Sequence, residues 1–445
     1  MHTSRTLWRH AMAAVLAAAA GNAAAVTFSE AYRAALENDP SFRMNFYENE
    51  AAKENRVLGR GGLLPSVNAS YSASRNRVDL EAQDLLGRDS LSHPQYISRS
   101  SVVQLRQPLF NLEAVARYRQ GKVQSDASAA LFAAQRGDLV VRVASAYLDT
   151  LLSVDAVALN RAQRDMYAEQ AKANERLFAK GEGTRTDVLE TAAKLDQSEA
   201  QLLEAQDALA TNRANLATII GMDPGQLQAL DPDFRFAPLS PQGLDEWKAL
   251  ALANNEVIKS RRLSVESARL EVQKAYAGHA PRVDFVATYS KNDAETVNTY
   301  NQNSLNRAIG VQVNIPLYQG GQVSAGARQA VAGLERAKAE LQVQTDRVTI
   351  ELRKAYSTVV SSVARIQALD KAVTSAQLLV KATEQSIKGG VRINLDLLNA
   401  QQQLTSVRRD LAQARYTYLV AQLRLRAAAG TLSAADVNMV AGYFR

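Results

Sequence analysis

The segment VTIELRKAYSTVVSSVARIQALDKAVTSAQLLV, residues 348–380, carries the pattern that decides the fold. Its apolar and small residues recur in alternating steps of four and three, which is the 3.5-residue period of a coiled-coil seam. The seam positions are Val348, Leu352, Ala355, Val359, Ser362, Ile366, Leu369, Val373, Ala376 and Val380. Residues 140–158, 195–209 and 397–418 show the same period. The sequence therefore predicts helices that pack along one another as coiled coils.

Proline is absent from two long stretches that contain these seams. None occurs between Pro108 and Pro224, and none follows Pro316. Because proline breaks helix interiors, such gaps permit very long helices. A helix from Leu112 to Phe178 would extend about 100 Å at 1.5 Å per residue. That length is unsuited to a compact enzyme, and the alanine-rich seams favour helices packed around a hollow over a dry leucine core.

The chain is an internal duplication, because segments of its first half recur in the same order in the second. The matches pair Leu64-Pro65-Ser66-Val67 with Ala280-Pro281-Arg282-Val283, Gln107-Pro108-Leu109-Phe110 with Ile315-Pro316-Leu317-Tyr318, and Gly181 and Asp187 with Gly390 and Asp396. We expect one structural repeat over 26–222 and another over 244–430, each with a helix, two strands, a long helix and a return helix. An irregular linker over 223–243 joins the repeats, and a C-terminal segment follows over 431–445.

Four segments of alternating apolar and polar residues are expected between the helices. They cover about 66–75 and 98–108 in the first repeat and about 282–290 and 305–316 in the second, with polar connections over 76–95 and 291–303. Such alternation is typical of transmembrane β-strands, and a soluble antiparallel sheet is the alternative. Because an open edge is not tolerated in lipid and the smallest membrane barrels have about eight strands, four strands require several chains. Three chains would supply twelve.

The N-terminus has the features of a secretory signal peptide, which we place at residues 1–25. Arg5 and Arg9 precede the apolar run 11–20, and Ala23-Ala24-Ala25 offers a cleavage site. No later stretch has about 18 uninterrupted apolar residues, so no transmembrane helix is expected. The chain has no cysteine, so we expect neither a disulfide framework nor an N-terminal lipid anchor. Its net charge of +7 falls to +5 without the two arginines, which gives no sign of nucleic-acid binding.

An enzyme is a poor alternative for this sequence. Beyond the signal the chain keeps only His93 and His279, and it has no Gly-x-Ser-x-Gly, P-loop or His-Glu-x-x-His motif. We therefore expect no catalytic residues, no cofactor and no resident metal site. A periplasmic structural coiled coil without a pore is the other alternative, and the four alternating strands argue against it.

The ordered set of motifs resembles the TolC family of outer-membrane channels. Its most specific element is PLYQGG at 316–321, together with Leu64-Pro65, Gln107-Pro108-Leu109-Phe110 and AAGTL at 428–432. The resemblance implies an α+β membrane protein in which a homotrimer forms a 12-stranded β-barrel in the Gram-negative outer membrane and a coiled-coil α-helical tunnel in the periplasm. It also implies three kinds of partner, namely a periplasmic adaptor (membrane fusion) protein, an inner-membrane transporter of the ABC type and the lipids of the outer membrane. The missing cysteine favours the type I secretion and TolC branch of the family over lipoprotein members that serve multidrug pumps, so we expect a passive conduit for type I secretion or efflux.

The resemblance places a candidate gate at the periplasmic ends of the long helices. The turns there, where the adaptor would dock, comprise Gly181, Glu182 and Gly183 in the first repeat and Gly389, Gly390 and Val391 in the second. Glycines also simply permit a tight helix–helix turn. The Asp187 and Asp396 carboxylates would begin the return helices, where acids complement the helix dipole and Thr186 or Asn394 could cap. Under threefold symmetry a lumen-facing aspartate becomes a ring that attracts cations and could bind a blocking metal ion.

Arg392 aligns with an arginine that family members pair with the aspartate at the position of Asp187 to hold the gate shut. The sequence departs from the TolC pattern at two other positions. Ile387 stands where TolC has a gate tyrosine, and Asn399 stands where TolC has a second selectivity aspartate. We therefore expect a shut state held by fewer contacts and an entrance with lower cation selectivity.

Overall fold

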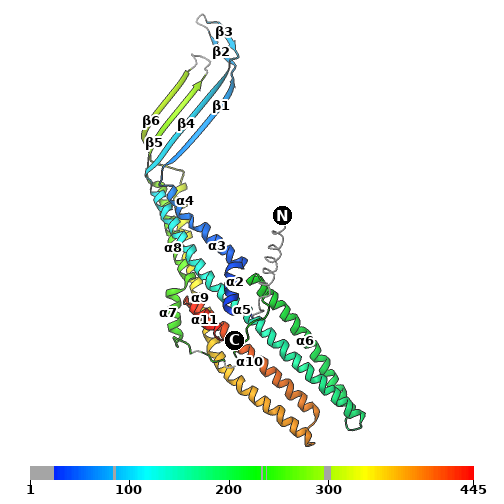
Figure 1. The fold of residues 1–445 in the computed structure, drawn as a ribbon. Helices are drawn as coiled ribbons and strands as arrows, with labels where there is room; N and C mark the ends of the chain where they lie inside the picture. The colour runs from blue at the N-terminus through cyan, green and yellow to red at the C-terminus, as the bar shows by residue number, and fades with distance from the viewer. Residues whose placement is uncertain (1–24, 84–86, 232–233, 237, 295–301) are drawn as a thin grey trace, which may run out of the picture. The chain divides into compact units, whose positions relative to one another are not determined.

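The computed structural model describes residues 25–83, 87–231, 234–236, 238–294 and 302–445 (Figure 1). Apart from Ala25, the expected signal peptide lies outside the described residues. The chain divides into two compact units, a helical unit of residues 25–47, 132–257 and 345–445 and a sheet unit of residues 48–131 and 258–344. The chain passes between them within α3 (Pro40–Lys53), α5 (Leu112–Ala179), α8 (Glu256–Tyr276) and α9 (Gln322–Lys388). None of the helices in the described ranges combines the length and apolar character needed to cross a bilayer.

The sheet unit contains one antiparallel four-stranded sheet in the order β1-β4-β5-β6 (Figure 1). Its strands are β1 (Ser66–Arg77), β4 (Gln95–Phe110), β5 (Arg282–Ala294) and β6 (Gln302–Asn314). β4 begins earlier than the alternation predicts, because polar residues continue the pairing as far as Arg77 and Gln95. The connection expected over 76–95 contains a hairpin of its own, β2 (Leu80–Gln83) and β3 (Asp89–Ser92). Alternation alone therefore understates the length of these strands.

Two glycines bring α4 (Asn55–Gly61) against the start of α5 in the sheet unit. A Cβ added to Gly121 would lie 2.2 Å from the carbonyl oxygen of Asn55, and one added to Gly59 would lie 2.9 Å from that of Arg117. Residue 55 thus opposes 121 while residue 59 opposes 117, so the two helices run antiparallel with their backbones in contact. No residue larger than glycine fits this approach without a shift.

The helical unit is built from two antiparallel coiled coils. Within it α6 (Arg185–Ile220) returns along α5, and α10 (Asn394–Ala429) returns along α9 (Figure 1). The predicted seams are buried in the structure at Val348, Leu352, Ala355, Val359, Ser362, Ile366 and Ala376 of α9 and at Ser198, Leu202 and Ala205 of α6. One core cluster joins Val157 of α5 to Leu202 and Ala205. The prediction from the 3.5-residue period is therefore confirmed at these positions.

Of the shorter helices of this unit, α2 (Phe28–Asn38) packs on α6 and on α11 (Ala434–Ala441), and α7 (Leu244–Asn254) packs on α10. Tyr147 of α5 donates a hydrogen bond to the carbonyl of Val26 at 2.9 Å, and its ring contacts Phe28 and Phe444 edge-on. The linker pairs with the C-terminal segment through the bridge of Leu230 to Phe444. The first described residues, the linker and the C-terminal segment therefore meet around Tyr147.

Candidate functional site

The two helix–helix turns have the same backbone geometry at an offset of 209 residues. In the first, Gly181 has φ 76° and donates its N–H to the carbonyl of Phe178 at 2.9 Å, while Glu182 donates to Leu177 at 3.0 Å. The residues 209 positions later make the same two hydrogen bonds, each 2.9 Å, around Gly390 with φ 73°. Positive φ favours glycine, so both turns close the helix in the left-handed manner of a Schellman motif.

The return helices begin differently in the two repeats. At α6, Thr184 has extended φ and ψ and accepts a hydrogen bond from the Asp187 N–H at 3.1 Å, while the Asp187 carboxylate accepts from Thr184 Oγ1 at 2.6 Å. This is a capping box. The prediction that Thr186 caps is wrong, because Thr186 already lies within the helix. At α10 the N-cap is Ile393, which has no capping side chain, and the Asp396 carboxylate has no hydrogen bond or ion pair with any described residue.

Asn394 is the first residue of α10, and its side chain joins α10 to the other coiled coil. Its Oδ1 accepts a hydrogen bond from Gln170 Nε2 of α5 at 2.7 Å, and its amide nitrogen donates to Thr191 Oγ1 of α6 at 3.4 Å. Thr191 also accepts from Asn174 Nδ2 at 2.7 Å, and both are buried, at 0% and 5% exposure. Asn394 is therefore a connector between three helices and not the cap that the sequence suggested.

Sequence reasoning missed this network of Gln170, Asn174, Thr191 and Asn394. The available signal was polar side chains on segments predicted to pack as coiled coils. Buried amides and hydroxyls at such positions fix the register of packed helices because each must find a partner. Which helix supplies the partner depends on tertiary packing, which periodicity does not encode.

The structure brings the expected gate residues to the same end of the helical unit without joining them. Among the described residues, no hydrogen bond or ion pair links Asp187 to Arg392, which is exposed. Ile387 is half-buried in the last turn of α9, and Asn399 is exposed on α10. Most of the turn positions are exposed, namely Gly181, Glu182, Gly389, Gly390 and Val391, while Gly183 is half-buried. The pairing of Asp187 with Arg392 stays a prediction.

Two tyrosines make further links between α5 and α10 within the helical unit. Tyr416 donates a hydrogen bond to Asp155 Oδ2 at 2.7 Å, and Tyr167 donates to the carbonyl of Leu398 at 3.4 Å. Burial raises the pKa of Asp155, and the hydrogen bond from Tyr416 opposes that shift. Burial likewise raises the pKa of Tyr167. Both hydroxyls thus remain protonated donors near neutral pH.

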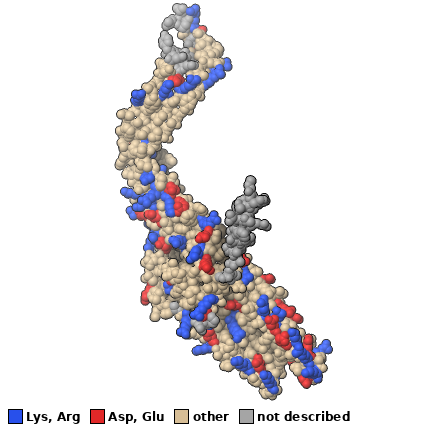
Figure 2. All heavy atoms as spheres, viewed as in Figure 1, with Lys and Arg blue, Asp and Glu red and all other residues tan. Residues whose placement is uncertain are grey.

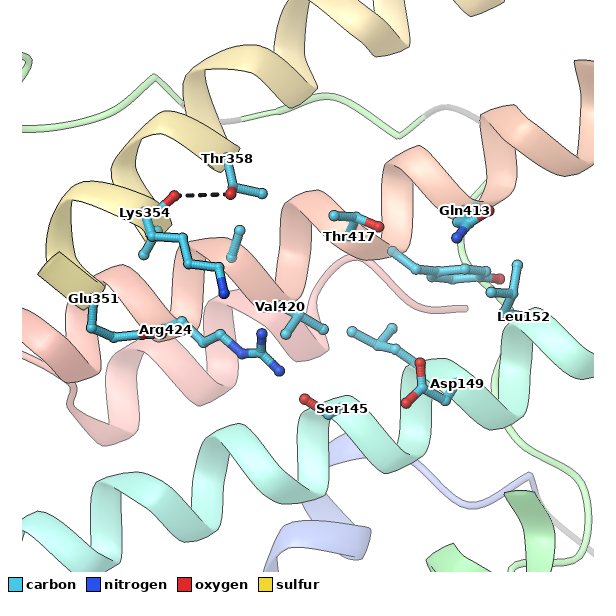
Figure 3. Close-up of a pocket in the computed structure, with 14 residues that line it drawn as sticks. Ser145, Asp149, Leu152, Glu351, Lys354, Thr358, Gln413, Thr417, Val420 and Arg424 are labelled. Carbon is cyan, nitrogen blue, oxygen red and sulfur yellow. Dashed lines mark hydrogen bonds between the residues drawn. The ribbon is translucent and has the colours of Figure 1, made fainter. Parts of the chain in front are cut away.

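A cavity of about 230 Å³ lies between α5, α9 and α10 of the helical unit (Figure 3). Its charged lining comprises Asp149, Glu351, Lys354 and Arg424. Burial raises the pKa of Asp149, and the positive charge of Arg424 opposes the shift. Acids and bases are balanced here, so the cavity has no strong preference for one sign of charge. Among the described residues, no group of His, Cys, Asp and Glu is arranged to hold a metal ion.

The four-stranded sheet is amphipathic along its whole width. One paired row is apolar, with Val67, Leu105, Ala287 and Ile309 side by side. A row on the opposite face is polar, with Ser72, Ser100, Asn292 and Ser304. On the edge strands Val67 is 63% exposed and Ile309 is 82% exposed. Within the described chain neither β1 nor β6 has a second neighbour in this sheet, so both edges are available for pairing.

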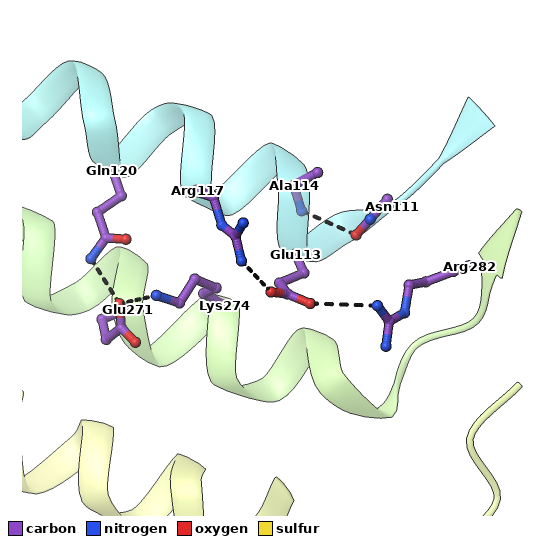
Figure 4. Close-up of polar contacts among 8 residues, drawn as sticks. All are labelled: Asn111, Glu113, Ala114, Arg117, Gln120, Glu271, Lys274 and Arg282. Atoms are coloured by element: carbon purple, nitrogen blue, oxygen red, sulfur yellow. Dashed lines mark hydrogen bonds and ion pairs between the residues drawn. The ribbon is translucent and has the colours of Figure 1, made fainter. Parts of the chain in front are cut away.

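One ion pair joins the first residue of β5 to α5, and a hydrogen bond joins α5 to α8 (Figure 4). The Glu113 carboxylate of α5 contacts Arg117 at 2.8 Å and Arg282, the first residue of β5, at 3.9 Å. Gln120 of α5 donates to Glu271 of α8 at 2.8 Å. The contact of Glu113 with Arg282 places that side of α5 next to the polar face of the sheet.

Comparison with known proteins identifies the family whose sequence pattern this chain shares. The model of the family described as "Outer membrane efflux protein" matches residues 31–222 and 247–431, which are most of the chain. The alkaline protease secretion protein AprF of Pseudomonas aeruginosa is 39% identical over 99% of this chain and 92% of its own length. The proteases secretion protein PrtF of Dickeya chrysanthemi is 36% identical over 97% of this chain and 94% of its own length.

A less similar sequence and a solved structure extend the comparison. The outer membrane protein TolC of Vibrio cholerae is 29% identical over 93% of this chain and 92% of its own length. The crystal structure of the CmeC outer membrane channel of Campylobacter jejuni superposes with a TM-score of 0.79 at 15% identity, covering 94% of this chain and 90% of that one. At that level of identity the likeness concerns the fold alone.

Proposed function

We propose that this chain, which belongs to the outer membrane efflux protein family and is an outer-membrane channel of Gram-negative export with a large periplasmic portion, carries secreted proteins. The observation that supports this cargo is the likeness to two secretion proteins named for proteases, each matched over nearly the whole chain. An extracellular protease is the cargo we expect. The chain itself catalyses nothing and serves as a passive conduit.

Deletion of the gene in its source bacterium tests the cargo. The culture supernatant is expected to lose one or more proteins, with proteolytic activity among the losses, and a plasmid copy of the gene should restore them. Susceptibility to small toxic compounds is measured in parallel. A full supernatant together with increased susceptibility to those compounds would instead identify a drug efflux channel.

We propose that three copies assemble. The sheet of each chain has one apolar face and two open edges, β1 and β6. Both edges must be paired in lipid, because every unsatisfied backbone group there costs several kcal/mol. Three chains close a barrel of about twelve strands, within the range known for outer-membrane proteins. Light scattering of the detergent-purified protein should give three chains per particle, and two or four would exclude this stoichiometry.

The helix–helix turns are proposed as the gate and the adaptor-docking tip. Arg392, which is exposed, would bond an aspartate of a neighbouring coil and hold the tip shut. If that aspartate is Asp187, its Oδ1 is the oxygen left for Arg392, because Oδ2 already accepts two hydrogen bonds from Thr184. Asp396, which has no described partner, is the carboxylate freer to face the lumen. Asn399 would lower the cation selectivity of that entrance.

Single-channel conductance in a planar bilayer tests the gate. Both Arg392→Ala and Asp187→Ala should raise conductance, while Arg185→Ala, an exposed cation at the start of α6, serves as the control. Thr184→Ala separates the loss of the cap from the loss of the gate contact. If both gate variants conduct like the wild type, the assignment is wrong. Asn399→Asp should shift the reversal potential toward greater cation selectivity.

The partners are proposed from the same family role. A periplasmic adaptor would engage the exposed turns, and an inner-membrane transporter of the ABC type would supply the energy for export. Affinity purification of the tagged chain after cross-linking in cells should recover both. Substitution of Gly390 by a β-branched residue should reduce recovery of the adaptor, because positive φ at that position is strained for any side chain.

A further inference from the structure

We propose that a cationic surface at the base of the sheet, formed by Arg56, Arg60, Arg119 and Lys122, binds the phosphate headgroups of anionic phospholipids in the periplasmic leaflet of the outer membrane. The proposal rests on the outer-membrane location of the family and not on the cargo or the gate. Figure 2 shows many Lys and Arg, with some Asp and Glu beside them, where the helices of the sheet unit meet the sheet. All four side chains are exposed.

Arg56, Arg60 and Lys122 lie on one side of the α4–α5 pair, and Arg119 lies on the adjoining outer surface of α5. Arg56 and Arg60 are one helical turn apart on α4, flanking the contact residue Gly59, and Arg119 and Lys122 flank the contact residue Gly121 on α5. The helices run antiparallel. Viewed from one end of the pair, successive residues therefore rotate clockwise about one axis and anticlockwise about the other. This places the residues that follow Gly59 and Gly121 by one position, Arg60 and Lys122, on the same side of the pair.

That side continues the apolar face of the sheet. Glu113 contacts Arg282, which belongs to the same face of β5 as Asp284 and the polar row of the sheet. Lys122 lies nine residues after Glu113, which is two and a half turns at 3.6 residues per turn, and so points to the opposite side of α5. Exposed Phe110 and Leu112, at 45% and 46%, lie directly between the strand end and these cations. Apolar residues followed by cations are the order expected across a bilayer interface.

The four cations are not paired with carboxylates of the described residues. None of the four makes an ion pair with a described residue, whereas Lys53 at the end of α3, three residues before Arg56, pairs with Glu50. The nearest acid on that side of α5 is Asp126, one turn further from the sheet. Arg60 is within one residue of the end of α4, and Lys122 is about 15 Å from the start of α5 at 1.5 Å per residue. Arg60 and Arg119 are thus close enough to the sheet to contact lipid headgroups. Lys122 lies further from the sheet and is the last residue of this surface on α5 that we expect to contact them.

Anionic lipid explains the cluster better than a free anion does. Four unpaired cations without a buried pocket give little geometric selectivity for a single small ion. A leaflet presents many phosphates at once, and each Lys or Arg near such a surface adds to the attraction. Arginine also suits phosphate because its planar fork can donate two hydrogen bonds.

Native mass spectrometry of the full-length, assembled protein tests the proposal. The detergent-solubilised wild type is titrated with phosphatidylglycerol, with phosphatidylethanolamine and with inorganic phosphate, and bound lipids are counted. Arg56→Gln, Arg60→Gln, Arg119→Gln and Lys122→Gln combined should weaken phosphatidylglycerol binding at least tenfold and leave phosphatidylethanolamine binding unchanged. A matched control removes the same number of charges from exposed positions of α9 in the helical unit, Arg347, Arg353, Arg365 and Lys371.

Assembly of each variant is checked by light scattering before lipids are added. If the fourfold variant fails to assemble, the two double variants of α4 and α5 are compared, each expected to lose part of the preference. Arg56→Lys, Arg60→Lys and Arg119→Lys combined should keep most of it, because charge is retained. The proposal would be overturned if the control variant lost as much phosphatidylglycerol binding as the fourfold variant, or if the fourfold variant kept its preference for phosphatidylglycerol. It would also be overturned if inorganic phosphate displaced the lipid at equal concentration. The proposal would also be overturned if the wild type, but not the fourfold variant, sedimented with peptidoglycan and neither bound phosphatidylglycerol.

Discussion

Substitution of Gly121 by alanine should separate α4 from α5. The new Cβ would lie 2.2 Å from the carbonyl oxygen of Asn55, whereas ordinary contact begins at 3.4 Å, so one backbone must move by about 1.2 Å. Overpacking of this kind costs about 1–3 kcal/mol, and the rigid carbonyl places this site at the upper end. Alanine returns about 1 kcal/mol of helix propensity. The net loss should be about 2 kcal/mol per chain.

A graded series makes this reasoning refutable. At Gly59 the added Cβ would meet the Arg117 oxygen at 2.9 Å, a milder clash, while at Gly333 of α9 nothing lies within 4 Å. Thermal loss of helical ellipticity at 222 nm, measured on the assembled protein in detergent, should therefore begin earliest for Gly121→Ala. Gly59→Ala should fall between it and the wild type, and Gly333→Ala should melt slightly higher than the wild type. Gly121→Ala melting at or above Gly333→Ala would refute the close-contact argument.

Three more substitutions test the polar links of the helical unit. Ile393→Thr should build at α10 the capping box that α6 has, stabilise the assembly by about 1 kcal/mol and occupy Asp396, so that melting temperature rises and cation selectivity falls in a reversal-potential measurement. Asn394→Ala leaves the partly buried amide of Gln170 with only its longer hydrogen bond to Asn174, at 3.4 Å, so it should cost about 1 kcal/mol and increase single-channel conductance. Asp155→Asn removes a carboxyl whose pKa burial raises above 3.8, so the folded state binds that proton more tightly than the unfolded state. The melting temperature of the wild type relative to Asp155→Asn should therefore rise as pH falls from 7 toward 3.8, and a constant difference would contradict the raised pKa.

Much of the architecture follows from local rules that a single sequence contains. The α+β fold with long paired helices and the likeness to the TolC family are confirmed. They could be predicted because a sustained 3.5-residue period and long stretches without proline are compatible with few other folds. The helix expected over Leu112 to Phe178 ends one residue later, at Ala179. The two helix–helix turns could also be predicted from their glycines, because the positive φ at Gly181 and Gly390 favours glycine over other residues. The number of chains in the assembly stays a prediction.

Contacts between distant segments were beyond the reach of the sequence. Capping depends on which residue takes extended φ and ψ, and the threonine that does so is Thr184, two positions before the one that composition suggested. Asn394 was readable only as a local cap, because its partner Gln170 lies 224 residues away. β4 extends to Gln95 through polar residues whose pairing no hydrophobic pattern reveals. In each case tertiary packing, and not local preference, decided the outcome.

The duplication supplies two turns of equal backbone geometry, and one cap makes them unequal in chemistry. At α6 the Asp187 carboxylate accepts hydrogen bonds from the N–H and the hydroxyl of Thr184, so part of its charge is already committed to the helix end. At α10 the residue 209 positions after Thr184 is Ile393, which can offer nothing, and Asp396 keeps its charge free of any described partner. A carboxylate without a partner presents the stronger field to a passing ion. In the proposed tip we therefore expect the second repeat to set ion selectivity and the first to hold the tip rigid.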